Sequence, residues 1–437
     1  MLPYVTIIGG GLAGCETAYQ IAKAGIPVKL YEMKPIKYSP AHSNENLAEI
    51  VCSNSFKSNL HTNACGLLKE ELLLLNSLLI RIANEVKVPA GQALAVDREI
   101  FSKRVTEEIK NMENIEIINE EVTKIPEEGI TVIATGPLTS DKLSEEISKL
   151  TGSNKLAFYD AAAPIIEKNS IDMNIAFMAN RYDNEKEEKE EASYLNLPMN
   201  KEEYEAFWNE LVNAQVVELH EFEKREIFEG CMPIEVMAKR GIDTLRFGPL
   251  KPVGFIDPRT GKRPYAIVQL RQDNKQGTIY NMVGFQTNLK YGEQKRVFQM
   301  IPGLENAEFV KYGVMHRNTF IHSPSLLDET YCMNKNSNIY FAGQITGVEG
   351  YVESISSGMV VALNIIKKYK NEEPLIFPEE TMIGALAKYI STPNDKFQPM
   401  NANFGILPQL PERIKDKKIK YAKLADIAIE KMKQIIQ

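Results

Sequence analysis

Glycines and one carboxylate near the start of the chain have the spacing needed to bind a dinucleotide. The apolar run Val5–Ile8 leads into a cluster that reads Gly9, Gly10, Gly11, Leu12, Ala13 and Gly14. In a strand–turn–helix unit, Gly9 permits the tight turn, Gly11 lets the backbone approach a pyrophosphate, and Gly14 lets the helix pack on the strand. Glu32 ends the next apolar run, where an acid accepts hydrogen bonds from a ribose hydroxyl. This context favours a dinucleotide site over a glycine-rich turn that binds nothing.

Two later strands also end on glycines. Thr131–Gly136 has an Ala-Thr-Gly ending that is typical of flavoproteins of the glutathione reductase type, and a second strand from Asn338 ends on Ala342-Gly343. A strand that ends this way and opens a helix places backbone N–H groups beside a flavin ring and its ribityl chain. Each turn alone could be an ordinary strand-to-helix connection, but the three together favour FAD. The expected contacts in the later turns are Gly136, Gly343, Gln344 and Gly347.

Two of the five cysteines could act as a nucleophile or a base. Cys52 precedes small polar residues shortly after the first β-α-β unit, so we expect it above the flavin. Cys231 lies between glycine and Met-Pro in an irregular turn, where a thiol is more accessible than in a helix core. Cys15 falls inside the first helix and is expected to pack there, while Cys65 and Cys332 have no distinguishing context. For any single cysteine the alternative is a small buried hydrophobe.

The elements that must position these residues predict an α/β protein. We expect a Rossmann-type FAD-binding domain of the glutathione reductase type, interrupted by an inserted α+β domain and followed by a helical C-terminus. The expected parts are 1–150 (FAD-binding, first part), 151–330 (inserted substrate or RNA domain), 331–372 (FAD-binding, second part) and 373–437 (C-terminal helical segment).

Local patterns predict individual elements. Asp97-Arg98-Glu99 opens a helix that runs to about Lys110, in which Arg98 could contact FAD phosphates or simply belong to a helix cap. The apolar stretch 67–82 is interrupted by charged residues and predicts one amphipathic helix rather than a membrane span. Asn200 and Glu203 form a capping-box pattern before a helix over 201–214. Alternating runs at 265–270 and 278–283 predict antiparallel strands.

Composition limits the function classes. Hydrophobic residues make up 44% and charged residues 25%, as in an ordinary soluble globular protein. The net charge of −7 argues against indiscriminate nucleic-acid binding but allows a local basic groove. The cysteines and five histidines show neither a disulfide framework nor metal spacing, so we expect no structural metal. The first strand begins at Tyr4, which leaves no room for a presequence, and we expect a cytoplasmic protein.

Five blocks of sequence together resemble one known family over almost the whole chain. They are Ile7–Gly14, Leu47–Ser55, Glu229–Glu235, Tyr312–Thr319 and Phe341–Tyr351. The set closely resembles TrmFO, historically called Gid, a family of FAD- and folate-dependent tRNA (uracil-5-)-methyltransferases. One small departure is Cys15, where family members often carry serine.

The resemblance implies methylation of C5 of a uridine, in the family's usual case in the T-loop of tRNA. The carbon would come from 5,10-methylenetetrahydrofolate and the electrons from reduced FAD, which NAD(P)H recharges. By family analogy Cys231 is the nucleophile that adds to C6, and Cys52 is the base or second thiol. The reverse assignment stays open, because the sequence does not order the two in space.

Folate binding has its own candidate residues. His316 could stack on a pteridine or flavin, Arg317 could pair with the folate glutamate carboxylate, and Tyr351 completes the set at the last glycine turn. The alternative for His316 and Arg317 is a buried, hydrogen-bonded turn.

Three other functions remain open at this stage. The same chemistry could act on a uridine of ribosomal RNA, the chain could modify a wobble uridine as GidA does, or it could be a non-catalytic flavin-containing RNA scaffold. The paired segments of Cys52 and Cys231 favour the methyltransferase. The sequence gives no prediction of oligomeric state.

Overall fold

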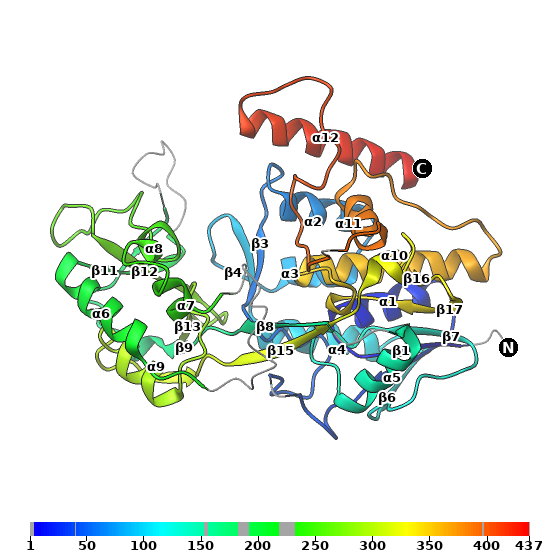
Figure 1. The fold of residues 1–437 in the computed structure, drawn as a ribbon, viewed down its shortest axis with the longest axis horizontal. Helices are drawn as coiled ribbons and strands as arrows, with labels where there is room; N and C mark the ends of the chain where they lie inside the picture. The colour runs from blue at the N-terminus through cyan, green and yellow to red at the C-terminus, as the bar shows by residue number, and fades with distance from the viewer. Residues whose placement is uncertain are drawn as a thin grey trace.

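The structure is a computed structural model of the 437-residue chain, and it describes residues 4–39, 41–152, 156–181, 192–217, 232–395 and 397–436. At positions 156–160, 316 and 317 only the backbone is described. The molecule is elongated, with one six-stranded sheet toward each end of its long axis (Figure 1). The charge run 184–191 and the whole segment 218–231, which includes Cys231, lie outside the described residues.

The first sheet is a Rossmann-type sheet in the order β16-β17-β7-β1-β2-β6, parallel except for β16. Its strands are β1 (Val5–Ile8), β2 (Val28–Glu32), β6 (Ile115–Asn119), β7 (Ile130–Ile133), β16 (Cys332–Met333) and β17 (Asn336–Phe341). All four residues of β1 are buried, as expected for a central parallel strand with helices on both faces. Its register places Val5 opposite Val28 on one side and Ile130 on the other.

Two helices from opposite ends of the chain pack together beside this sheet. They are α1 (Leu12–Lys23) and α10 (Tyr351–Tyr369). Gly358 permits the close approach, because a Cβ atom there would lie 2.5 Å from the carbonyl oxygen of Ala13. The parallel pairing of β17 with β7 and the packing of α10 on α1 bring this late part of the chain back beside the first sheet.

The predicted helix over 67–82 is wrong in one respect, because it is two helices. They are α2 (Ala64–Leu74) and α3 (Leu78–Glu85). The apolar periodicity continues across the break, but Asn76 adopts a left-handed conformation with φ of 60°. Ser77 then caps α3 by accepting a hydrogen bond from the N–H of Ile80. The helix after Asp97 is confirmed as α4 (Arg98–Lys110), with the Asp97 carboxylate as its cap.

The second sheet is antiparallel and lies entirely between Ile165 and Lys311, in the order β10-β11-β12-β13-β9-β14. Its strands are β9 (Ile165–Glu167), β10 (Phe177–Ala179), β11 (Tyr194–Met199), β12 (Ala266–Gln272), β13 (Ile279–Met282) and β14 (Phe309–Lys311). The accompanying helices are α6 (Lys201–Asn213), α7 (Ile234–Ala238), α8 (Thr244–Phe247) and α9 (Tyr291–Phe298). The capping box of Asn200 and Glu203 and the antiparallel pairing of β12 with β13 confirm the predictions for this region.

A two-stranded ribbon connects the two sheet regions. It pairs β8 (Leu156–Ala161) with β15 (Met315–Phe320) in antiparallel register, and it runs along the long axis (Figure 1). A further three-stranded sheet has the order β3-β5-β4, and its first strand begins three residues after Cys52. Its strands are β3 (Ser55–Ser58), β4 (Lys87–Val88) and β5 (Ala93–Val96).

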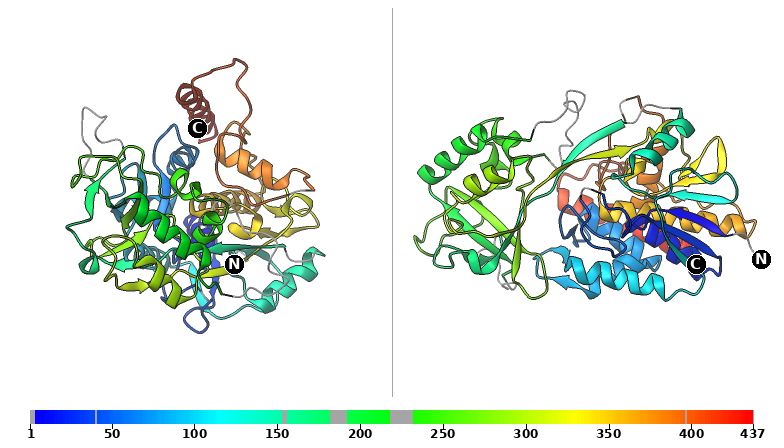
Figure 2. Two further views of the ribbon diagram at one scale, coloured as in Figure 1. Left: turned by 60° about the vertical axis from the view of Figure 1, so that its left-hand side comes forward. Right: turned by 90° about the horizontal axis from the view of Figure 1, so that it is seen from below.

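The C-terminal stretch is helical only in part. Besides α5 (Asp141–Thr151) in the first domain, the remaining described α-helices are α11 (Met382–Ser391) and α12 (Lys417–Ile436). Helix α12 packs against α2 and lies along the outside of the molecule (Figures 1 and 2). Thus the prediction of a helical C-terminus holds for these two helices and not for residues 373–381, 392–395 and 397–416.

Candidate active site

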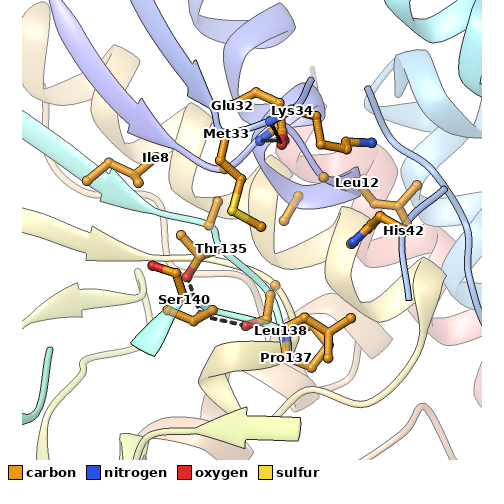
Figure 3. Close-up of a pocket in the computed structure, with 18 of the residues that line it drawn as sticks. Ile8, Leu12, Glu32, Met33, Lys34, His42, Thr135, Pro137, Leu138 and Ser140 are labelled. Carbon is orange, nitrogen blue, oxygen red and sulfur yellow. Dashed lines mark hydrogen bonds between the residues drawn. The ribbon is translucent and has the colours of Figure 1, made fainter. Parts of the chain in front are cut away.

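A cleft of roughly 1080 Å³, including its open mouth, lies beside the ends of β1, β2 and β7 (Figure 3). Most of the residues predicted to bind FAD line it. They are Gly9, Gly10, Gly11, Leu12, Ala13, Glu32, Gly136, Gly343 and Gln344. Two predicted residues lie behind the lining. A Cβ atom at Gly14 would be 1.9 Å from the carbonyl oxygen of Gly9, and one at Gly347 would be 2.5 Å from the ring of Phe397, so these two glycines permit close packing.

The start of α1 fits the pyrophosphate of a dinucleotide. Gly11 is the N-cap residue, and the position of a Cβ atom there has no atom within 4 Å, so the backbone is open to the cleft. The first N–H groups of a helix have no partner within it, and together with the helix dipole they attract anions. A side chain at position 11 would fill the space that a phosphate needs. The geometry therefore fits FAD at the predicted place.

Glu32 is buried and faces the same turn. One carboxylate oxygen accepts the N–H of Gly10 and the other accepts the N–H of Lys34, each at 3.0 Å. Each oxygen can accept further hydrogen bonds, so the carboxylate can still bind a ribose hydroxyl. In Figure 3 it lies at the edge of the cleft beside Lys34. The Lys34 ammonium pairs with Glu49 at 3.2 Å, which links this turn to the segment that leads to Cys52.

Cys52 directly follows Val51, which lines the cleft, and its backbone is held by Tyr351. The N–H groups of Cys52 and Ser53 donate to the Tyr351 hydroxyl at 3.0 and 3.1 Å, and Tyr351 itself lines the cleft. The thiol is 3.7 Å from the carbonyl oxygen of Ala161, the last residue of β8. Burial raises the pKa of Tyr351, so its phenol stays protonated at neutral pH. Tyr351, predicted as a folate contact, is therefore also a direct support for the Cys52 backbone.

Two cations lie close to this thiol. The Arg98 guanidinium pairs with Asp273 at 3.0 Å and donates to the carbonyl oxygen of Val51 at 3.3 Å, while its second terminal nitrogen is buried without a partner. Burial and the charge of Arg98 lower the pKa of Lys311, against opposing effects of Asp273 and Cys52. Arg98 thus reaches the Cys52 segment instead of capping its helix.

Lys311 was not singled out from the sequence. Its only available signal was its position directly before the block that begins at Tyr312, because a lone lysine at the end of a strand has no distinguishing pattern.

After residues 218–231, the next residue that the structure describes is Met232, which follows Cys231 in the chain. Helix α7 begins two residues later and is fixed by the buried carboxylate of Glu235. That carboxylate accepts the Thr287 hydroxyl and the N–H of Asn288, both at 2.8 Å. Burial raises the pKa of Glu235, while these hydrogen bonds oppose the rise. The chain that follows Cys231 therefore has a fixed attachment.

The other folate candidates lie on β15. The backbone of His316 pairs with that of Asp160, and the backbone of Arg317 pairs with that of Tyr159, on β8. Because β8 ends at Ala161 beside the Cys52 thiol, the strand that carries both candidates lies next to the strand that contacts Cys52. Their side-chain roles remain predictions.

The remaining described cysteines are buried. Cys15 donates to the carbonyl oxygen of Gly10 at 3.2 Å, and burial raises its thiol pKa. Burial also raises the pKa of Cys65 and of Cys332 to about 11. Among the cysteines in the described part of the chain, Cys52 alone is partly exposed.

The described residues lack two further features. They contain no group of three or more His, Cys, Asp or Glu side chains arranged to hold a metal ion. Within the same ranges, no helix combines the length and the apolar character needed to cross a bilayer.

Comparisons with known proteins agree with this geometry. The sequence model of a family described as glucose inhibited division protein A matches residues 4–373. A relative from Acetivibrio thermocellus, named methylenetetrahydrofolate–tRNA-(uracil-5-)-methyltransferase TrmFO, is 61% identical over 100% of this chain and 99% of its own length. A relative of the same name from Enterococcus faecalis is 59% identical over 100% of this chain and 99% of its own length.

Solved structures of Aquifex aeolicus GidA share the fold. The form I crystal structure has a TM-score of 0.70 and the form II structure 0.67, both at 17% identity. They cover 99% of this chain and 76% and 75% of the GidA chain, respectively. At this identity the likeness shows the fold alone.

Proposed function

The chain belongs to the TrmFO family, and from this membership we propose that it methylates C5 of a uridine in tRNA with 5,10-methylenetetrahydrofolate as the carbon donor. FAD is the reducing cofactor, and NAD(P)H recharges it. We place the enzyme in the cytoplasm. The observation that carries the proposal is the position of Cys52 beside a cleft whose glycine turns fit FAD.

The chemistry assigns one role to each reactive thiol. C5 of uracil is a weak nucleophile until a thiolate adds to C6, when the electron pair moves onto C5 and the C4 carbonyl as an enolate. We assign this addition to Cys231. C5 then attacks the methylene carbon of the folate, and the first of the two bonds from that carbon to folate nitrogens breaks.

Cys52 acts next as the base. Its thiolate removes the proton from C5, and the electron pair left on the ring expels the second folate nitrogen, which leaves an exocyclic methylene on the ring. The Arg98 guanidinium donates to the carbonyl oxygen of Val51 and so lies beside the Cys52 segment. Reduced FAD, when bound at the turn before α1, would supply the hydride that converts the methylene to methyl. The ring electrons then expel the Cys231 thiolate from C6 as C5=C6 re-forms.

Residues of the cleft have supporting roles. The Tyr351 hydroxyl holds the backbone of Cys52 in place, and the first turn of α1 with Gly11 and Glu32 binds the dinucleotide part of FAD. His316 and Arg317 remain the proposed folate contacts.

An assay of product nucleosides tests the proposal. Unmodified tRNA transcript is incubated with the protein, FAD, NADH and methylene-deuterated methylenetetrahydrofolate, and digested nucleosides are analysed by mass spectrometry. We expect 5-methyluridine that carries the deuterium, and no label from methyl-labelled S-adenosylmethionine. Label from S-adenosylmethionine would contradict the proposed donor.

The same assay separates the other functions. Product on ribosomal RNA and none on tRNA would change the substrate, while a modified wobble uridine would indicate a GidA-like activity. If neither RNA is modified by a flavin-loaded protein, the chain is a non-catalytic scaffold.

A further inference from the structure

One segment of the inserted domain has a charge opposite to that of the whole chain. Residues 239–263, here called the basic segment, contain seven basic and two acidic residues in a protein of net charge −7. The basic residues are Lys239, Arg240, Arg246, Lys251, Arg259, Lys262 and Arg263. Both acids pair with arginines of the same segment, Asp243 with Arg246 at 2.5 Å and Asp257 with Arg259 at 2.9 Å. The segment therefore has a net formal charge of +5, because its two acids can neutralise only two of its seven basic residues.

Phe247, at the end of α8 in this segment, is the most exposed of the large hydrophobic residues in the described part of the chain, at 82%. The helix is nevertheless fixed. Leu245 is fully buried, and the Arg246 guanidinium lies 3.5 Å from the centre of the Tyr265 ring and donates to the Tyr265 carbonyl at 3.0 Å. An exposed aromatic ring next to basic side chains, on an anchored helix, offers a flat surface for stacking beside groups that attract anions.

The basic segment is connected to the active site by a single strand. Tyr265 directly precedes β12, whose last residue, Gln272, accepts a hydrogen bond from Asn54 at 2.9 Å, two residues after Cys52. A seven-residue strand spans about 20 Å. In Figure 1, α8 lies above β12 at the top of the inserted domain. A partner that covers Phe247 while it reaches Cys52 must therefore extend about 20 Å along β12, as an RNA can.

We propose that the basic segment and Phe247 form a docking surface for the RNA substrate. This inference rests on the proposed function. Phe247 stacks on an unpaired base, a contact that any base can make, and Lys262 and Arg263 contact backbone phosphates. The charge of the segment explains how a protein with an acidic total charge can bind a polyanion. The distance along β12 lets the RNA bind there while one uridine enters the cleft.

Two sets of variants give different signatures. Phe247→Ala should weaken binding of an unmodified tRNA transcript about tenfold, within the range for loss of one stacked base, while Phe247→Tyr keeps the affinity. The double charge reversal Lys262→Glu with Arg263→Glu should weaken binding more, and it should reduce the slope of log K against log salt by about 1 per residue. For Phe247→Ala the salt slope should not change. In methylation assays both changes should raise the KM for tRNA and leave kcat at saturating tRNA unchanged.

Matched controls come from the first domain. Ile36→Ala removes another very exposed apolar side chain (73% exposed), and Lys335→Glu reverses an exposed lysine; neither should change tRNA affinity. FAD content and the rate of flavin reduction by NADH should be equal in all variants, which shows that they fold.

If the wild type binds and methylates tRNA while Phe247→Ala and the charge reversal match it, the docking surface is wrong and the proposed function stands. If the wild type modifies no RNA, the proposed function fails instead. A change in sedimentation coefficient without a change in tRNA affinity would assign the surface to a second copy of this chain and overturn the proposal.

Discussion

A single phenol oxygen supports the reactive segment that the structure describes. The Tyr351 hydroxyl accepts the N–H groups of both Cys52 and Ser53, and no other hydrogen bond from these two N–H groups is present among the described residues. Tyr351 lies 299 positions after Cys52 and 298 positions after Ser53 in the chain. The reactive thiol is therefore positioned by the first residue of a helix near the end of the chain, and not by its own neighbours.

Removal of this oxygen should uncouple cofactor binding from catalysis. Tyr351→Phe removes the acceptor of two half-buried N–H groups, at a cost of about 0.5–1.5 kcal/mol for each hydrogen bond and about 1–3 kcal/mol for both. We expect a free energy of unfolding lower by about that amount, normal FAD content, and single-turnover methyl transfer slower by tenfold or more. Urea unfolding, flavin absorbance and rapid-quench assays measure the three quantities. Tyr389 lies on α11, and its hydroxyl donates a hydrogen bond to the carbonyl oxygen of Gln398. As a control, Tyr389→Phe should not slow methyl transfer.

The order of the two thiols can be tested with RNA that contains 5-fluorouridine. Fluorine cannot leave C5 as a proton does, so addition of a thiolate to C6 should trap the protein on the RNA. The wild type should give a covalent adduct on a denaturing gel, Cys231→Ala should give none, and Cys52→Ala should keep FAD and still form the adduct. An adduct that persists in Cys231→Ala and disappears in Cys52→Ala would reverse the roles. An adduct in both single variants would remove cysteine addition from the mechanism.

At the scale of the element, the turn before α1 controls cofactor binding. Gly11 has an ordinary φ of −77°, so a larger residue is not excluded by backbone strain, and the space around it is open. Gly11→Val should therefore fold but lose FAD, because its side chain would occupy the position of the pyrophosphate. Flavin absorbance after reconstitution and thermal unfolding of the apoprotein test both halves of this prediction. Gly292→Val is a matched control, since Gly292 also has open space around it but lies on α9. Normal flavin content in Gly11→Val would contradict the assigned phosphate site.

Local patterns predicted the elements that carry their own signals. The glycine turn before α1, the cap at Asp97 and the capping box at Asn200 each depend on residues within a few positions of one another. The break between α2 and α3 was missed because the apolar periodicity continues past Asn76, whose left-handed conformation separates α2 from the cap of α3 at Ser77. Arg98 was expected to contact FAD phosphates or to cap its helix, and only the fold brings it to Val51 and Asp273. Local chemistry could thus identify the reactive residues, but not the groups that hold them.

At the scale of the whole molecule, the first domain is assembled from distant parts of the chain. The Glu71 carboxylate on α2 accepts the N–H groups of Met382 and Ile383 at the start of α11. Helix α12 buries Leu424, Ala425, Ala428 and Met432, but its other side is exposed and rich in lysine. The sequence analysis expected only a helical segment at this end of the chain. It did not show that α12 is attached to α2 by a specific polar contact.

That contact should make the attachment of α12 depend on pH. His61 lies just before α2, and its two ring nitrogens are 2.8 Å from Glu70 and 3.0 Å from Asp426 on α12. Partial burial lowers the pKa of His61, but the hydrogen bonds and charges of the two carboxylates raise it above the ordinary value of 6.5. Because the pKa is higher in the folded state, the contribution to stability is fully present below about pH 6.5 and is lost as pH rises through the folded-state pKa.

The difference in melting temperature between wild type and His61→Gln isolates this effect from other titrating groups. Glutamine cannot become charged, so the wild type should be the more stable protein at pH 6, and the difference should shrink steadily toward pH 8.5. Asp426→Asn should reduce the difference at pH 6 by removing the partner on α12, whereas Glu430→Gln, on the same helix, should not change it. A difference that stays constant from pH 6 to 8.5 would show that His61 bridges the two helices in its neutral form, and that the charge of the bridge does not hold α12 to the body of the protein.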